Sequence, residues 1–191
     1  MAMGRMLVGA IERARLTDVA ERALTGKGLG APDLARLARA DVLVVAGLAD
    51  AVRAKHRGHE VLVLTAAAAQ HASDLVVLEL DGDLAAGPTG QDLLVKVAIA
   101  RLATPCKQGI AVSCEQIGLE LAQTALVFGA DALIGDLVAS KKTLPLLDGP
   151  QARKTELMGL IQRAGRTVRF DGESATDAAT HSSAWTKEQL S

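Results

Sequence analysis

The chain has 191 residues, of which 49% are hydrophobic and 23% charged, and its formal net charge is −1. This composition predicts a globular protein with a sizeable core, while the near-neutral charge and scarce aromatic side chains argue against nucleic-acid binding. The chain has two cysteines, no clear signal peptide and no apolar run of about eighteen residues, so we expect no membrane span and a reducing, cytoplasmic location.

Residues 1–58 predict a helical N-terminal cap. Apolar side chains recur at helical spacing over residues 6–24, a short helix follows near residue 32, and a third helix is predicted over residues 47–55. The segment GKGLGAP between the first two has three alternating glycines, as phosphate-binding loops do. A phosphate loop follows a buried strand, whereas this segment follows a helix, which favours a helix–turn–helix connection.

Residues 59–170 alternate between predicted strands and helices. The apolar runs 60–65 (EVLVLT) and 74–80 (DLVVLEL) predict strands buried on both faces of a parallel sheet. The intervening AAAAQHA is shorter than the usual crossover helix. Further helices are predicted over residues 92–102, 119–128 and 151–164, and further strands over 110–113 and 167–170. Residues 132–138 are consistent with a last strand or with an extended loop.

The predicted fold class is therefore α/β, a helical N-terminal cap followed by an incomplete (β/α) barrel-like parallel sheet of about four or five strands. We expect residues 1–170 to form a single domain and residues 171–191 to form a mobile polar tail.

Cysteine and histidine residues are the first candidates for a chemical site. Cys106 and Cys114 could form a redox pair or bind a metal, but their spacing is not that of a metal pair, and buried structural thiols are favoured. His56, His59 and His71 surround the first predicted strand in polar, turn-like contexts, so solvated loop histidines are favoured over metal ligands.

Four polar side chains are candidates for ligand binding at the carboxyl ends of the strands: Glu115, Gln123, Asp131 and Asp136. Asp131 has the alternative role of a turn residue after a helix end. Trp185 stands alone in the polar tail and is a candidate anchor for docking on a partner, because tryptophan is enriched in binding hot spots.

Three C-terminal blocks carry a family resemblance: LLVKVAIARL, IGLELAQTALVFGADALIGDLV and RKTELMGLIQRAGRTV. In this order they resemble the end of the radical S-adenosylmethionine enzymes of futalosine-route menaquinone biosynthesis, aminofutalosine synthase and dehypoxanthine futalosine cyclase. The N-terminal block 23–64 is similar to the segment that leads into that family's first barrel strand, and the synthase is the closer match.

The sequence departs from this family where the chemistry lies. The resemblance implies a C-x3-C-x2-C loop after the first strand, whose thiolates hold a [4Fe–4S] cluster that cleaves S-adenosylmethionine. Here EVLVLT continues into AAAAQH without a cysteine, and the central barrel strands are missing. The family's acidic positions after FGAD are replaced by Ala132 and Ile134, and later glutamates by Ala139 and Ser140. We therefore expect no iron–sulfur cluster, S-adenosylmethionine site or other cofactor.

The main hypothesis is a shortened, non-catalytic relative of these enzymes with a scaffold or accessory role in menaquinone biosynthesis. An incomplete sheet leaves strand edges unpaired, so we expect a homo-oligomer or a protein partner such as a full-length radical enzyme. The alternative is a small enzyme or ligand-binding protein that uses a pocket at the strand carboxyl ends. A third possibility is a decayed remnant without a selected role.

Overall fold

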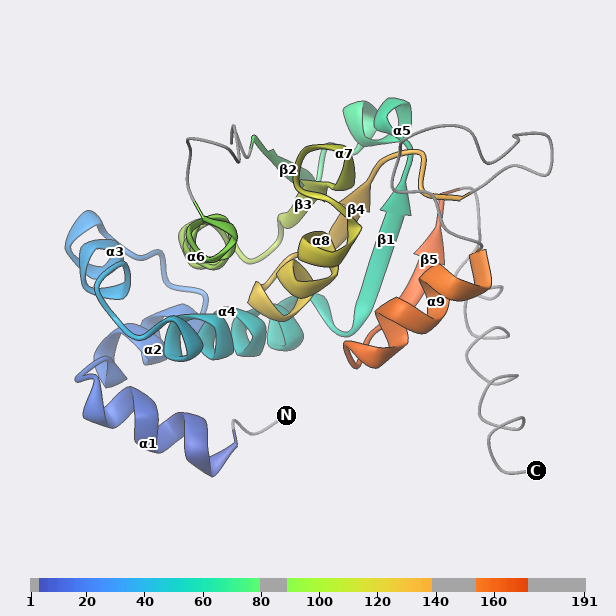
Figure 1. The fold of residues 1–191 in the computed structure, drawn as a ribbon. Helices are drawn as coiled ribbons and strands as arrows, with labels where there is room; N and C mark the ends of the chain where they lie inside the picture. The colour runs from blue at the N-terminus through green and yellow to red at the C-terminus, as the bar shows by residue number, and fades with distance from the viewer. Residues whose placement is uncertain (1–3, 80–88, 139–153, 172–191) are drawn as a thin grey trace, which may run out of the picture.

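A computed structural model describes residues 4–79, 89–138 and 154–171 of the chain. Within these ranges it contains nine α-helices, one 3-10 helix and five strands (Figure 1). In chain order they are α1 (Arg5–Arg13), α2 (Thr17–Leu24), α3 (Ala31–Leu37), α4 (Val42–Arg57), β1 (Glu60–Leu64), α5 (Ala66–His71), β2 (Leu75–Leu78), α6 (Gly90–Ala103), β3 (Gly109–Ser113), α7 (Cys114–Ile117), α8 (Leu119–Ala125), η1 (Leu126–Phe128), β4 (Ala132–Ile134), α9 (Lys154–Arg163) and β5 (Thr167–Phe170).

The predicted α/β class is confirmed, because helices form the N-terminal part and all five strands are parallel. The expected tail lies outside the described residues except for Asp171. None of the helices in the described ranges combines the length and apolar composition needed to cross a membrane.

The single helix predicted over residues 6–24 is two helices in the structure. Arg15 has a φ of 56°, a left-handed conformation, and it separates α1 from α2. The N–H of Leu16 donates to the carbonyl of Ile11 at 3.0 Å, as at the end of a Schellman motif. Arg36 donates a hydrogen bond to the carbonyl of Arg15. Apolar periodicity does not reveal this break, because the left-handed position carries arginine in place of glycine.

Helix α4 connects the N-terminal cap to the sheet. It extends from Val42 to Arg57, beyond the predicted 47–55, and begins where the Asp41 carboxylate accepts a hydrogen bond from the Leu43 N–H at 2.8 Å. It packs against α1 and α2 on the side of the cap and against α6 and η1 near the sheet (Figure 1).

The five strands form one sheet in the order β2-β3-β4-β1-β5. Strands β2, β3 and β4 are neighbours in chain order, and β4 then pairs with β1, with Leu62 opposite Ala132. On its other side β1 pairs with β5, with Val61 opposite Val168. In a (β/α) barrel each strand pairs with the next one in the chain, and β2, β3 and β4 follow that rule, whereas β1 and β2, and β4 and β5, are not neighbours. Within the described residues the sheet is open, with β2 and β5 at its edges.

The larger core lies between the sheet and helices α4, α6, α8 and α9. Alternate strand residues face these helices, among them Val61 and Val63 of β1, Ile110 and Val112 of β3, and Leu133 of β4. In Figure 1, α8 and α9 lie across the same side of the sheet, over β4 and β5. This alternation follows from the two-residue repeat of a strand.

The opposite face carries a smaller core built with α5. Leu64, Ala69, Ala111, Ala132 and Ile134 are buried together there. Because β4 and β3 lie between β1 and β2, the connection through α5 spans three strand spacings, roughly 14 Å. The expectation that AAAAQHA is too short for a crossover is therefore wrong. Six helical residues suffice, since alanine side chains let α5 pack directly on the sheet.

Candidate functional site

A small pocket lies at the carboxyl edge of the sheet, where β/α enzymes place their sites. Its volume is about 120 Å³, and it lies among the ends of β1, β4 and β5. Its polar lining residues are Thr65, Asp136 and Asp171. The Thr65 hydroxyl already accepts a hydrogen bond from the Ala68 N–H at 3.2 Å. The volume equals that of about four water molecules and is below the roughly 300 Å³ at which ligand pockets begin.

The structure does not bring the four predicted ligand-binding residues together. Asp136 is exposed and lines this small pocket, whereas Glu115 is exposed on α7, after β3. The Gln123 side chain donates to the Leu160 carbonyl at 2.9 Å and so connects α8 to α9. Asp131 immediately precedes β4 and lies at the amino edge of the sheet. The shared pocket expected for these residues is thus not formed by the described chain.

Asp131 is the centre of a buried ion cluster. Its Oδ2 atom accepts hydrogen bonds from Nη1 of Arg101 at 3.0 Å and from the Ile110 N–H at 2.8 Å. Its Oδ1 atom lies 3.2 Å from Nε of Arg53 and 3.9 Å from Nε of Arg57. The Arg53, Arg101 and Asp131 side chains are at most 3% exposed. One carboxylate therefore faces two fully buried guanidinium groups.

Backbone carbonyls satisfy most of the remaining donors of these arginines. Arg53 donates to the carbonyls of Ala130, Gly58 and Glu60 at 2.7–2.9 Å. Arg101 donates to the carbonyl of Gln108 at 2.8 Å. Burial lowers the pKa of the Arg53 guanidinium from its ordinary value, and the nearby carboxylate opposes that shift. The cluster joins α4 and α6 to the starts of β1, β3 and β4, which is a structural role.

The two cysteines flank β3 rather than sharing a site. Cys106 is half-buried in the loop before the strand, and Cys114 is buried directly after it. Burial raises the pKa of the Cys114 thiol to about 12, so this thiol is protonated at neutral pH. A strand of five residues spans roughly 16 Å, and the two sulfur atoms are therefore not positioned as a redox or ligand pair.

The histidines lie at the surface and make local contacts. The Nε2 atom of His56 is 3.1 Å from the Leu24 carbonyl, and Nδ1 of His59 is 3.2 Å from Nη1 of Arg166. His71 is exposed at the end of α5. Across residues 4–79, 89–138 and 154–171, no three His, Cys, Asp or Glu side chains are grouped as metal ligands.

The glycine-rich segment GKGLGAP connects α2 to α3, as the helix–turn–helix interpretation predicts. Gly26 has a φ of 75°, which suits glycine at the helix end. Gly26 and Lys27 line a cavity of about 200 Å³ together with Cys106 and the end of α6. Helix α3 has seven residues, and its first carboxylate, Asp33, is 2.7 Å from Arg22. The segment therefore serves to pack the cap against α6.

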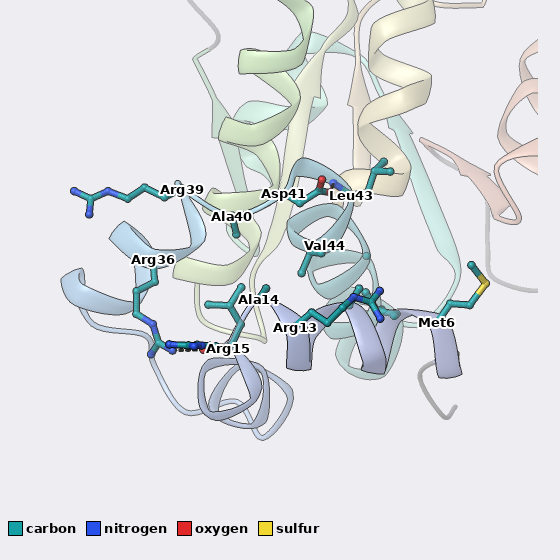
Figure 2. Close-up of a pocket in the computed structure, with 14 residues that line it drawn as sticks. Met6, Arg13, Ala14, Arg15, Arg36, Arg39, Ala40, Asp41, Leu43 and Val44 are labelled. Carbon is teal, nitrogen blue, oxygen red and sulfur yellow. Dashed lines mark hydrogen bonds between the residues drawn. The ribbon is translucent and has the colours of Figure 1, made fainter.

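A much larger hollow lies on the N-terminal cap, far from the carboxyl edge. This groove, of about 1150 Å³, is formed by α1, the turn after it, the end of α3 and the start of α4. Figure 2 shows Met6 and Leu43 toward one end, Arg36 and Arg39 at the other, and Arg13 between them. The amino-acid pattern does not reveal this groove, because it assigns exposed arginines to the solvated face of a helix and does not show which helices meet.

Comparison of the chain with protein-family models finds no matching family, and comparison with curated proteins finds no match either.

Proposed function

We propose that this protein is a non-catalytic relative of the radical S-adenosylmethionine enzymes of the aminofutalosine synthase group, with a scaffold or accessory role in menaquinone biosynthesis. The observation that carries the proposal is the segment after β1. Where that family has its three-cysteine loop, this chain has α5, an alanine helix packed on Ala111 and Ala132 of the sheet.

The thiols of the chain do not fit an iron–sulfur cluster. Cluster binding of this kind needs three closely spaced thiolates. The sequence contains two cysteines, which lie before and after β3, and the buried Cys114 has a raised pKa. Neither cysteine lies in the segment directly after β1, where the family has its three-cysteine loop.

The strand order supports the ancestry. The unit β2-β3-β4-β1 has the neighbours expected of the last three strands and the first strand of a (β/α) barrel. Strand β5 occupies the position beside β1 where a second barrel strand would pair. Four helices on one face correspond to the outer helices of a barrel.

The scaffold role rests on the open sheet. Strand β2 has a described partner only on the side of β3, and its Val77 side chain is 45% exposed. An unpaired edge with an exposed β-branched residue is a site for pairing with another chain. We therefore retain the expectation of self-association, or of a complex with a full-length radical enzyme.

Anaerobic iron–sulfur reconstitution tests the non-catalytic part of the proposal. We expect no bound cluster and no binding of S-adenosylmethionine, with an authentic aminofutalosine synthase reconstituted in parallel as the positive control. The double variant Cys106→Ser/Cys114→Ser should take up the same background iron as the parent chain. A stoichiometric cluster that is lost in this variant would overturn the proposal.

Size-exclusion chromatography with light scattering tests the scaffold part. We expect a mass above that of one chain, or a shift to a complex when the radical enzyme is added. A monomer at every concentration that binds no radical enzyme would contradict the role. Ligand binding at the carboxyl edge is the alternative function, but of the four candidate residues only Asp136 lines the small pocket there, so no observation favours it.

A further inference from the structure

The groove on the N-terminal cap carries an inference that does not depend on the proposed ancestry. One end of the groove exposes large apolar side chains to solvent. Among the described residues, Met6 at 90% and Leu43 at 74% are the most exposed of the large hydrophobic side chains. Both lie toward the same end of the groove in Figure 2, and the apolar side chains of Leu7 and Val44 also line the groove. Exposed apolar side chains gathered around a hollow mark a binding surface.

The other end of the groove is cationic. Arg36 and Arg39 lie there, and Arg13 lies between the two ends. With Arg15, four arginines line the groove, against the single carboxylate of Asp41 among its lining residues. Arg36 is paired with an aspartate of α2 at 2.9 Å, and the Asp41 carboxylate caps α4. Within the described chain, Arg13, Arg15 and Arg39 have no ion-pair partner. An occupant of this groove should therefore combine a large apolar side chain with carboxylates.

The segment 172–191 of this chain has that chemistry. It carries three carboxylate side chains, Glu173, Asp177 and Glu188, against one lysine, Lys187. It also holds Trp185, the only tryptophan of the sequence, which is a large apolar anchor of the kind that fills pockets at interfaces. The fourteen residues from Gly172 to Trp185 can extend over roughly 46 Å, more than the ~30 Å diameter of a small domain.

We propose that segment 172–191 docks in this groove of its own molecule, with Trp185 near Met6 and Leu43 and its carboxylates near Arg13 and Arg39. The docked segment covers the most exposed apolar side chains of the described chain. It also supplies counter-charge to arginines that have no described partner.

Trp185 itself reports this contact, because the sequence has one tryptophan and no tyrosine. In the full-length protein we expect its fluorescence to be shifted to shorter wavelength and protected from acrylamide, relative to a synthetic peptide of residues 172–191. The variants Arg13→Glu/Arg39→Glu and Leu43→Asp should each return the emission to that of the peptide. Arg163→Glu is the matched control, since it changes an exposed arginine of α9 outside the groove and should leave the emission unchanged.

Circular dichroism confirms that each variant is folded, and Arg36 is left intact because it holds the turn at Arg15. Peptide-like emission in the parent protein would overturn the proposal. So would a blue-shifted emission that neither groove variant changes, because Trp185 would then be buried elsewhere. A blue shift that disappears on dilution would also overturn it and would assign the groove to the tail of a second copy.

Discussion

Replacement of Asp131 by asparagine should cost about 3–5 kcal/mol of the free energy of unfolding, the range for breaking a buried ion pair on one side. The variant leaves Arg53 and Arg101, at 0% and 1% exposure, without a carboxylate. Asparagine can still accept the Ile110 N–H, which Asp131 accepts at 2.8 Å, but its amide donors then face the guanidinium groups. Since domains are stable by about 5–15 kcal/mol, the loss would be a large fraction of the total.

Urea unfolding followed by far-ultraviolet circular dichroism measures this loss. With a slope of about 2 kcal/mol per molar urea, the midpoint should fall by roughly 1.5–2.5 M. The matched control is Asp74→Asn, which removes a carboxylate 3.3 Å from Arg57 where the Asp74 side chain is 60% exposed. An exposed pair contributes about 0–1 kcal/mol, so this midpoint should change little.

A loss below about 1 kcal/mol in the Asp131 variant, at an unchanged slope, would refute this reasoning. It would mean that the backbone carbonyls around Arg53 and Arg101 alone offset the desolvation of their charges. Equal losses in the two variants would refute it as well, because the argument depends on the difference in burial between Asp131 and Asp74.

Further predictions concern the two cysteines and two of the glycines. Cys106 should react with iodoacetamide in the native protein and Cys114 only on unfolding, because burial raises the pKa of Cys114 to about 12. The contribution of Cys114 to stability should be complete below the thiol pKa of the unfolded chain, near 8.5, and should be lost as the pH rises toward 12. Gly129→Ala should lower the free energy of unfolding by roughly 1–3 kcal/mol, because φ is 98° and the new Cβ would lie 2.7 Å from Cγ of Arg101. Gly159 lies in helix α9, and a Cβ added there would have no atom within 4 Å, so Gly159→Ala should raise the free energy of unfolding by about 0.5–1 kcal/mol. A lower free energy of unfolding for Gly159→Ala, or an unchanged one for Gly129→Ala, would contradict the geometry.

The strands could be predicted from the sequence because their signal is local. The runs at β1, β3 and β5 are short, β-branched and bounded by turn residues, and the structure places strands over Glu60–Leu64, Gly109–Ser113 and Thr167–Phe170. The break at Arg15 could not be predicted in this way. It depends on Leu16 being buried and on Arg36 reaching the Arg15 carbonyl, which are contacts of the folded chain.

The positions of the candidate site residues could not be predicted without knowing the topology of the sheet. Asp131 and Asp136 are five positions apart in the sequence, yet β4 lies between them and places them at opposite edges of the sheet. A residue before a parallel strand belongs to the amino edge and one after it to the carboxyl edge, so the fine boundaries of a three-residue strand decide which carboxylate can reach a pocket. The buried arginines could have been suspected, since Arg53 and Arg101 each interrupt an otherwise apolar helix face.

If the barrel centre has been lost, as proposed, the face of the sheet that would line the barrel interior must be covered in another way. In a closed barrel, the side chains facing away from the outer helices fill the interior in layers of bulky branched residues. In this open sheet the same positions need another cover, and α5 supplies it over Leu64 and Ile134. Helix α5 can lie close to the sheet because Ala111 and Ala132 are small. The alanines of the helix and the small residues of the strands therefore pack together. Under the proposed ancestry, α5 thus replaces both the segment that would carry the cluster and the side-chain layers that would fill the barrel interior.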